Sequence, residues 1–242
     1  MRILVSNDDG VFSPGILALA RVAGEFGQVR VVAPDVEQSA MSHAITVRRP
    51  LHYTKTEING IEAFRVDGTP ADCVALGTHH WEEVDLVLSG INLGHNLGHN
   101  VWHSGTVAAA KQAAFLRIPA VAFSAPYVDG ATDYDALAPF IREVIGIMQE
   151  PGAPLLVNVN LPAAPRGIQW TRQSVRHYEG FVIPGEDPMG RRHYWFSEEP
   201  RGKVEEGTDR WAVEHDLVSV TPLRLDLTDE AQLLRVHQGS GS

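Results

Sequence analysis

Short apolar runs that alternate with amphipathic segments are the feature that most constrains the fold of this chain. Five runs of five or six residues are bounded by Gly, Pro or polar residues, and they occupy residues 2–6, 29–33, 84–89, 119–124 and 155–159. Continuous apolar runs of this length are typical of strands that are buried on both faces of a parallel sheet. The pattern therefore predicts a buried parallel sheet.

Helical segments separate these predicted strands. Apolar residues at helical spacing and helix stop or cap signals predict helices at residues 14–26, 70–80, 104–115 and 133–149. The second is the clearest, because Thr69 is a typical N-cap and Pro70 and Asp72 suit a first helical turn. Strand and helix in alternation predict a doubly wound α/β fold, in which ligands bind at the carboxyl ends of the strands.

The pattern changes after about residue 167. Hairpin-like segments follow at 170–178, 194–196 and 218–225, with a stretch rich in Gly and Pro at 180–190. We predict a catalytic core at 1–166, a β-rich extension at 167–238 packed on it within a single domain, and a flexible tail at 239–242. The aromatic residues of 194–196 indicate either an interface between subunits or a local extension of the sheet.

Composition narrows the classes of partner. The formal net charge is −10, with 44% hydrophobic residues in 242. This acidic balance argues against stable binding to nucleic acid or to an anionic membrane, because such proteins carry a basic face. No apolar run approaches the ~20 residues of a membrane span, and residues 3–5 are too few for a signal peptide. A single cysteine, Cys73, cannot form an internal disulfide, so we predict a cytoplasmic protein.

Two adjacent acids follow the first predicted strand. Asp8 and Asp9 precede Gly10, which permits a turn that lets both carboxylates converge. Carboxylates held this close repel each other unless a cation lies between them, so the pair predicts a site for a hard divalent metal. The alternative is a surface turn at Asp9 and Gly10 with Asp8 as a helix cap.

Two later strand ends add neutral oxygen ligands. Ser39 follows the second predicted strand and Asn92 the third. Together with Asp8 and Asp9 they make four hard ligands with a charge of −2, which suits Mg²⁺ or Mn²⁺ better than a softer metal.

The predicted helix at 104–115 begins with groups that suit a phosphate. A helix start presents unpaired N–H groups, Ser104 and Thr106 add hydroxyls, and Gly105 leaves the approach open. The same residues also form an ordinary N-cap, which needs no ligand.

Three histidines share a spacing of four residues without forming a convincing metal site. His95, His99 and His103 would line one face of a helix, but the Gly and Asn residues between them disfavour a helix. We place them near the pocket, as phosphate or leaving-group contacts, and we interpret Cys73 as core packing.

Several of these segments together resemble the survival protein E family, which comprises metal-dependent nucleotidases and phosphatases. The matching segments are SNDDG at 6–10, APD at 33–35 with Gln38 and Ser39, GTPADC at 68–73, SGINLG at 89–94 with Asn96, and SGTVAAA at 104–110. Thr208, Asp209 and residues 219–223 extend the resemblance over most of the chain.

The resemblance implies a three-layer α/β/α Rossmann-like sandwich with a mixed, largely parallel sheet. It also implies hydrolysis of nucleoside monophosphates with a divalent cation, and a homodimer or homotetramer built partly through the C-terminal extension. By position, the metal ligands are Asp8, Asp9, Ser39 and Asn92. The phosphate contacts are Asn96, Ser104, Gly105 and Thr106.

The chain departs from the family pattern around the pocket. It has Ala40 where the family has Gly, neutral His99 and Asn100 where acids are common, and His103 where Tyr is common. These differences leave the metal set intact and concern recognition of the leaving group.

The hypothesis is phosphomonoester hydrolysis by metal-activated water, with one metal per subunit. The cation would polarise a phosphoryl oxygen and the water, and Asp8 or, better, Asp9 could instead orient that water as a base. One alternative is an aspartyl-phosphate intermediate, although the two acids lack a spacer between nucleophile and acid. Another is a non-catalytic nucleotide-binding or signalling domain, although the third strand end has Asn92 where a phosphoacceptor domain has Asp.

Overall fold

A nine-stranded sheet forms the centre of the molecule in the computed structural model, which describes residues 1–127, 132–175, 178–200 and 204–239. Its order is β3-β4-β2-β1-β5-β6-β7-β11-β8. These strands are β1 (Arg2–Ser6), β2 (Gln28–Pro34), β3 (Tyr53–Ile58), β4 (Ile61–Val66), β5 (Leu86–Leu93), β6 (Ala120–Ala125), β7 (Leu156–Asn160), β8 (Gly167–Trp170) and β11 (Leu217–Pro222). All five predicted strands are among them.

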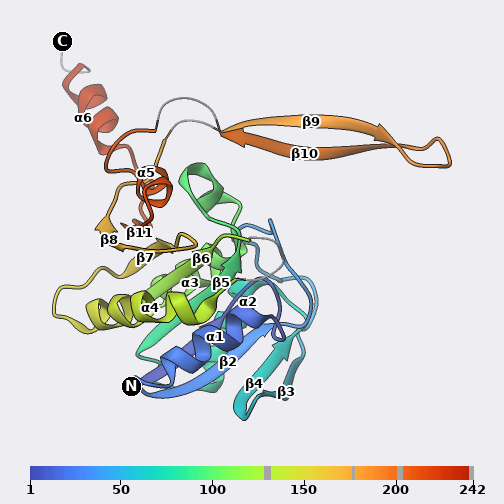
Figure 1. The fold of residues 1–242 in the computed structure, drawn as a ribbon, viewed down its shortest axis with the longest axis vertical. Helices are drawn as coiled ribbons and strands as arrows, with labels where there is room; N and C mark the ends of the chain where they lie inside the picture. The colour runs from blue at the N-terminus through green and yellow to red at the C-terminus, as the bar shows by residue number, and fades with distance from the viewer. Residues whose placement is uncertain (128–131, 176–177, 201–203, 240–242) are drawn as a thin grey trace.

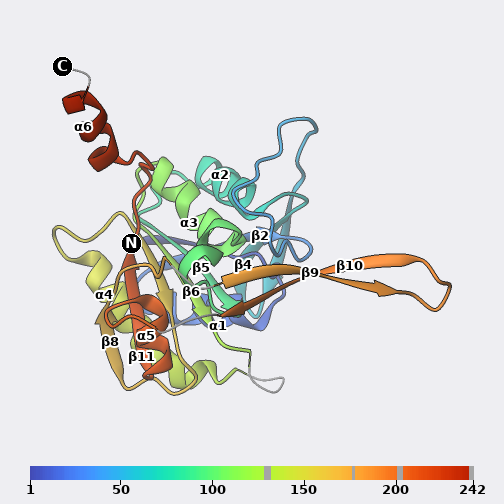
Figure 2. The same cartoon turned by 90° about the horizontal axis from the view of Figure 1, so that it is seen from above.

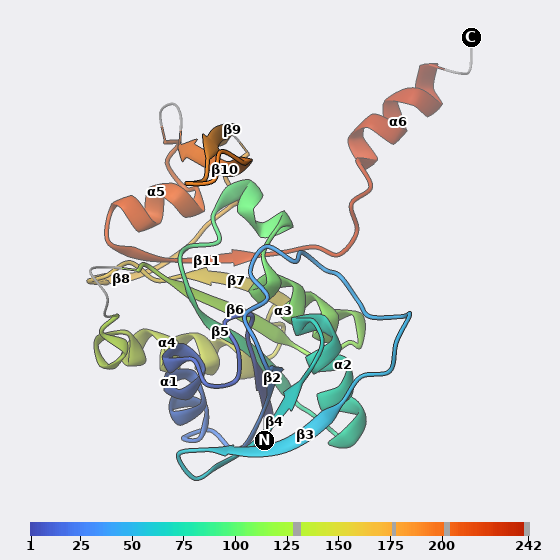
Figure 3. The same cartoon turned by 90° about the vertical axis from the view of Figure 1, so that its right-hand side faces the viewer.

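Helices cover both faces of this sheet (Figures 1 and 3). One layer contains α1 (Pro14–Ala23) and α4 (Tyr134–Gln149), and the opposite layer contains α2 (Pro70–His80) and α3 (Gly105–Phe115). Strand β1 shows that the sheet is buried on both faces. Ile3 and Val5 pack in the α1–α4 cluster, while Leu4 packs in the α2–α3 cluster. The predicted three-layer α/β fold is confirmed.

Strand directions make the sheet mixed and largely parallel, as the family resemblance implies. Strands β4, β2, β1, β5, β6 and β7 pair in parallel, whereas β3 pairs antiparallel with β4 and β11 antiparallel with β7. Consequently the carboxyl ends of β2, β1 and β5 meet at one edge. Neighbours β2 and β5 flank β1, so the chain leaves β1 at a switch point of the sheet order, where α/β folds bind ligands.

The extension predicted at 167–238 includes both strands of the main sheet and a separate pair of strands. Strands β8 and β11 extend the main sheet beyond β7, so residue 166 is no break in the sheet, because β11 satisfies the backbone of β7. Only β9 (Tyr178–Glu186) and β10 (Arg192–Pro200) form a separate sheet. This antiparallel pair, called the arm below, projects from the body (Figures 1 and 2). The segment predicted at 170–178 contributes its first residue, Trp170, to β8 and its last, Tyr178, to β9, while residues 176–177 lie outside the described residues.

The sequence analysis missed the β3–β4 hairpin at the sheet edge. Charged residues interrupt both strands, so no apolar run marks them. The sequence did contain a signal for the turn, the pair Asn59-Gly60. Both residues have positive φ in the structure, at 48° and 82°. An Asn-Gly pair of this kind is the preferred two-residue hairpin turn.

Two C-terminal helices were also missed, α5 (Asp209–Glu214) and α6 (Glu230–Gly239). Helix α6 projects away from the body and carries exposed Leu233, Leu234 and Val236 (Figures 1 and 3). It includes the first residue of the predicted tail, whose residues 240–242 lie outside the described part of the chain. Across the described residues, no helix combines the length and apolar character needed to cross a membrane.

Candidate active site

The turn after β1 is held by Asn7, a residue that the sequence analysis did not assign. Its side-chain amide donates hydrogen bonds to the Gly10 carbonyl (3.0 Å) and to Ser13 Oγ (2.7 Å), and its Oδ1 accepts one from the Gly10 amide (3.2 Å). Gly10 has φ +99°, which an L side chain rarely adopts. This closed turn holds Asp8 and Asp9 at the carboxyl edge of the sheet.

Asp8 is packed against the first turn of α3. Only 4% of the residue is exposed, and Oδ1 accepts a 2.5 Å hydrogen bond from Thr106 Oγ1. A Cβ atom on Gly105 would lie 2.7 Å from the Asp8 Cβ atom, so a side chain there would displace the carboxylate. Burial is the main reason that the pKa of Asp8 is raised, and the Thr106 hydrogen bond opposes this rise.

Asp9 has an unsatisfied carboxylate. Its Oδ2 is buried and has no hydrogen-bond partner. Burial first, and then the charge of Asp8, raises the pKa of Asp9 to about 7, while the backbone amide of Leu93 opposes this rise. Two adjacent carboxylates with raised pKa values and one unpartnered oxygen fit a bound cation, which would restore the charged form of both.

A cavity of about 490 Å³, called the Asp8 cavity below, opens at this edge. Its lining includes five of the eight predicted site residues: Asp8, Ser39, Asn92, Asn96 and Ser104. Asp9, Gly105 and Thr106 are not among the lining residues. The observed contacts of Gly105 and Thr106 are with Asp8, which places them behind the carboxylate that they position.

The two neutral candidate ligands present oxygens in different ways. Asn92 uses its Nδ2 to donate to the Gly94 carbonyl (2.6 Å), which leaves its Oδ1 available as a ligand. Ser39 is exposed and donates to Glu37 Oε1 (2.6 Å). Its loop is joined to the turn after β1 by a 2.7 Å hydrogen bond from the Gln38 amide to the Asp8 carbonyl.

Ser104 caps the helix that faces the cavity. Its Oγ accepts from the Val107 amide (3.1 Å), so its hydroxyl hydrogen remains able to donate to a ligand. The helix predicted at 104–115 begins one residue later, at Gly105, with Ser104 as its N-cap.

A buried amide cluster supports Asn96, and the sequence analysis missed it. The Asn96 amide donates to Asn160 Oδ1 (2.8 Å), its carbonyl accepts from Asn158 Nδ2 (2.8 Å), and its side chain donates to Ser124 Oγ (2.8 Å). All three partners are fully buried. The signal was present as two asparagines in the otherwise apolar strand β7 (LVNVN), where an unpaired amide would be costly.

The histidines do not share one role. His95 and His103 line the Asp8 cavity, and His95 Nε2 lies 2.8 Å from the Leu161 carbonyl. Burial lowers the pKa of His95. His99 lies in a short 3₁₀ helix, η1 (Gly98–Trp102), and is exposed. Within the described ranges, no three His, Cys, Asp or Glu residues gather as a metal site.

Asp209 connects the C-terminal part to the site. This fully buried carboxylate accepts hydrogen bonds from the Gly98 amide (2.8 Å) and from the Ser174 amide (3.0 Å). Gln173 Nε2 also donates to the Gly98 carbonyl (2.6 Å). The loop that carries Asn96 into η1 is therefore held by residues about 75 to 110 positions away in the chain.

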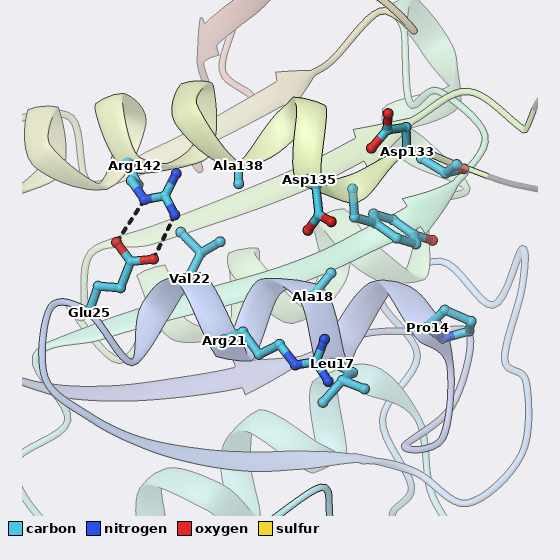
Figure 4. A pocket seen from close by; sticks show the side chains of 12 residues that line it. Pro14, Leu17, Ala18, Arg21, Val22, Glu25, Asp133, Asp135, Ala138 and Arg142 are labelled. Atoms are coloured by element: carbon cyan, nitrogen blue, oxygen red, sulfur yellow. Dashed lines mark hydrogen bonds and ion pairs between the residues drawn. The ribbon is translucent and has the colours of Figure 1, made fainter.

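A second cavity, of about 420 Å³, lies between α1 and α4 (Figure 4). Its acidic lining includes Asp133 and Asp135, and Arg142 is already engaged, with Nε and Nη2 each 2.7 Å from a Glu25 carboxylate oxygen. The two aspartates at the start of α4 are exposed, so this cavity lacks a buried carboxylate like that of Asp8.

Comparison with known proteins shows the family of this chain. The family model described as "Survival protein SurE" matches residues 3–180. The chain belongs to the SurE family. It is 52% identical to "5'-nucleotidase SurE 1" of Thermus thermophilus over 94% of this chain and 93% of that protein. It is 46% identical to "5'-nucleotidase SurE" of Deinococcus radiodurans over 94% of this chain and 88% of that protein.

A solved structure of the SurE family has the same fold. The crystal structure of the SurE protein from Aquifex aeolicus superposes with a TM-score of 0.84 and 40% sequence identity, covering 99% of this chain and all of that one. The resemblance inferred from short segments is thus confirmed over nearly the full SurE-family chain. Cys73, in the GTPADC segment, is fully buried in the α2–α3 cluster, which agrees with core packing.

Proposed function

We propose that this SurE-family chain is a metal-dependent 5′-nucleotidase that releases phosphate from nucleoside monophosphates in the Asp8 cavity. Family membership and the name shared by its relatives support this activity directly. The single observation that carries it is the buried Asp8–Asp9 pair, with an unpartnered oxygen on Asp9, beside a capped helix start.

One divalent cation per subunit, Mg²⁺ or Mn²⁺, is part of the proposal. Asp8 and Asp9 would hold it, with Asn92 Oδ1 and Ser39 Oγ as neutral ligands. These are hard oxygen donors, which both ions prefer. When bound, the cation supplies charge stabilisation at the phosphoryl oxygens and a more acidic water.

The protein's own groups would orient the phosphate. Ser104 Oγ can donate to a phosphoryl oxygen, and Asn96 lies in the same lining. The amide cluster around Asn96 and the Thr106 contact to Asp8 keep these groups in place before the substrate arrives. Fixed donors of this kind stabilise the charge that develops during phosphoryl transfer.

Asp9 is also the group best suited to orient the attacking water. Its Oδ2 has no hydrogen-bond partner in the described structure, so this carboxylate has an oxygen free to accept a proton from water. Asp8 is less suited because its Oδ1 is already bonded to Thr106.

Removal of each carboxylate tests the activity. Asp8→Asn and Asp9→Asn should each lower the Mn²⁺-dependent release of phosphate from a nucleoside monophosphate by roughly a hundredfold or more. Calorimetry should show weaker Mn²⁺ binding in both variants. Asp135→Asn, the same change in the α1–α4 cavity, is the matched control and should retain activity. Wild-type rates in both site variants would contradict the proposal.

We propose further that the chain assembles as a homodimer or homotetramer through its C-terminal part. Exposed Trp195 and Ile183 on the arm, and Leu233 and Leu234 on α6, support this, because apolar groups gathered on projecting elements mark interaction surfaces. Light scattering on the full chain should give a multiple of the 26.5 kDa chain mass; a monomer at all concentrations would contradict it. The cytoplasmic location predicted from the sequence is tested by cell fractionation.

A further inference from the structure

One residue of the Asp8 cavity comes from outside the edge of the main sheet where β1, β2 and β5 end, called the catalytic edge below. The other lining residues come from the loops after β1 and β2, from the end of β5 and from the segment that leads through η1 into α3. Phe196 alone comes from the arm, where it lies on β10. The arm therefore contributes an aromatic ring to a site whose other lining residues belong to the edge of the main sheet.

The two faces of the arm differ in their surroundings: one faces the Asp8 cavity and the other points away from it. In an antiparallel pair, directly opposed residues share a face and consecutive residues point to opposite faces. Phe196 is opposed to Val182, and Trp195 is opposed to Ile183. The face of Phe196 thus lines the Asp8 cavity, and the face of Trp195 points away from it, which leaves Trp195 free for the proposed contact between subunits.

Phe196 is available to a ligand. It is 89% exposed even though it lines the cavity, so little of the described protein covers the ring. An exposed phenyl group at the mouth of a polar cavity offers a flat apolar surface without a hydrogen-bonding group.

The size of the Asp8 cavity leaves space beside the phosphate. At about 490 Å³, it falls in the range of roughly 300–1,000 Å³ that accommodates whole small molecules. The phosphate-orienting groups belong to the catalytic edge, so the remainder of a nucleotide must extend toward the other lining residues. Only Phe196 among the lining residues has an aromatic carbon ring, since His95 and His103 are imidazoles.

We infer that Phe196 is the surface on which the base of the substrate stacks, which makes it a specificity-determining residue for nucleotides over other phosphomonoesters. This inference rests on the proposed nucleotidase activity. Stacking between a base and an aromatic side chain contributes mainly to ground-state binding, so its loss should appear in KM.

The test compares two substrates that differ only by the base: adenosine 5′-monophosphate and ribose 5-phosphate. With Mn²⁺ present, Phe196→Ala should raise the KM for the nucleotide about tenfold (~1.4 kcal/mol) and leave kcat and the KM for ribose 5-phosphate unchanged. Phe196→Trp should restore the low KM. Trp195→Ala, the neighbouring aromatic on the other face, is the matched control and should leave both KM values unchanged.

An equal nucleotide KM in Phe196→Ala and wild type would overturn the inference, and so would equal changes for both substrates. If wild type released phosphate from neither substrate, the proposed activity would fail separately. In that case calorimetry with adenosine 5′-monophosphate and Mn²⁺ still decides the role of Phe196: a Kd raised about tenfold in Phe196→Ala supports it, and an unchanged or unmeasurable Kd in wild type and variant overturns it.

Discussion

The catalytic edge of the main sheet and the arm hold their functional side chains in opposite ways. At the edge, Asp8 is almost fully buried and is held by Thr106 and by close packing on Gly105. On the arm, Phe196 and Trp195 are 89% and 66% exposed. Groups that react must be fixed before the substrate binds, whereas groups that recognise a base or a second chain need an open surface.

The two regions also differ in the free energy that is needed to keep their functional side chains in place. Burial raises the pKa values of Asp8 and Asp9, so the edge is destabilised at neutral pH until a cation compensates the two charges. The exposed aromatics of the arm carry no charge and need no such compensation. The comparison predicts that substitutions behind Asp8 reduce turnover, whereas substitutions on the arm alter recognition or assembly.

Gly105→Ala should have the largest effect. The added methyl would lie 2.7 Å from the Asp8 Cβ and 2.9 Å from its Oδ2, so the carboxylate must move, and displacements of this size can lower kcat/KM by ~100-fold. Overpacking should also cost about 1–3 kcal/mol of stability. Steady-state kinetics and thermal unfolding measure the two effects.

Gly146→Ala is the matched control, since it is also a helical glycine and has no atom within 4 Å of an added Cβ. This variant should keep full activity and gain up to about 1 kcal/mol of stability. Wild-type kcat/KM in Gly105→Ala would show that the contact with Asp8 does not matter for turnover.

Thr106→Val should have the next largest effect. The change keeps the shape and removes the hydrogen bond to Asp8, and hydrogen bonds to charged groups contribute about 1.5–3 kcal/mol. We therefore expect kcat/KM to fall by roughly 10- to 100-fold and Mn²⁺ affinity to weaken. Thr106→Ser keeps the hydroxyl and should retain most of the activity. Equal loss in both variants would assign the defect to packing.

Asp9→Asn in the metal-free protein should have a smaller, pH-dependent effect. The folded-state pKa of about 7 exceeds the ordinary value of 3.8, so the favourable contribution of protonated Asp9 is complete below about pH 4 and is lost as the pH rises through 7. Asn cannot ionise. With chelator present, the variant should have a higher Tm than wild type at about pH 8, where each kcal/mol of added stability corresponds to roughly 2–4 °C. At about pH 4 the two proteins should have the same Tm. An equal difference at both pH values would contradict the pKa assignment.

Trp195→Ala should have the smallest effect on turnover. It lies on the outer face of the arm, so kcat should stay within about twofold of wild type while light scattering shows weaker assembly. A large fall in kcat together with an unchanged mass would contradict the division between edge and arm.

Local patterns were sufficient for the core of the fold. Apolar runs and helix caps predicted β1, β2, β5, β6 and β7 and the helices α1 to α4 within a few residues. Edge and C-terminal elements were missed, because β3, β4 and α6 carry many polar side chains, so no continuous apolar run marks them. Only the Asn-Gly turn between β3 and β4 offered a usable local signal.

For the site, the sequence by itself determined the chemistry: two adjacent acids at a strand end, a capped helix start, and the family. All three depend on residue type and short spacing, which a linear pattern contains. Only the tertiary structure decided which residues contact and position these groups. It directed Thr106 and Gly105 to Asp8, placed Asn158 and Asn160 under Asn96, and placed Phe196 at the cavity. The hydrogen bonds among these contacts join residues 62 to 98 positions apart, which become neighbours only when parallel strands align their carboxyl ends.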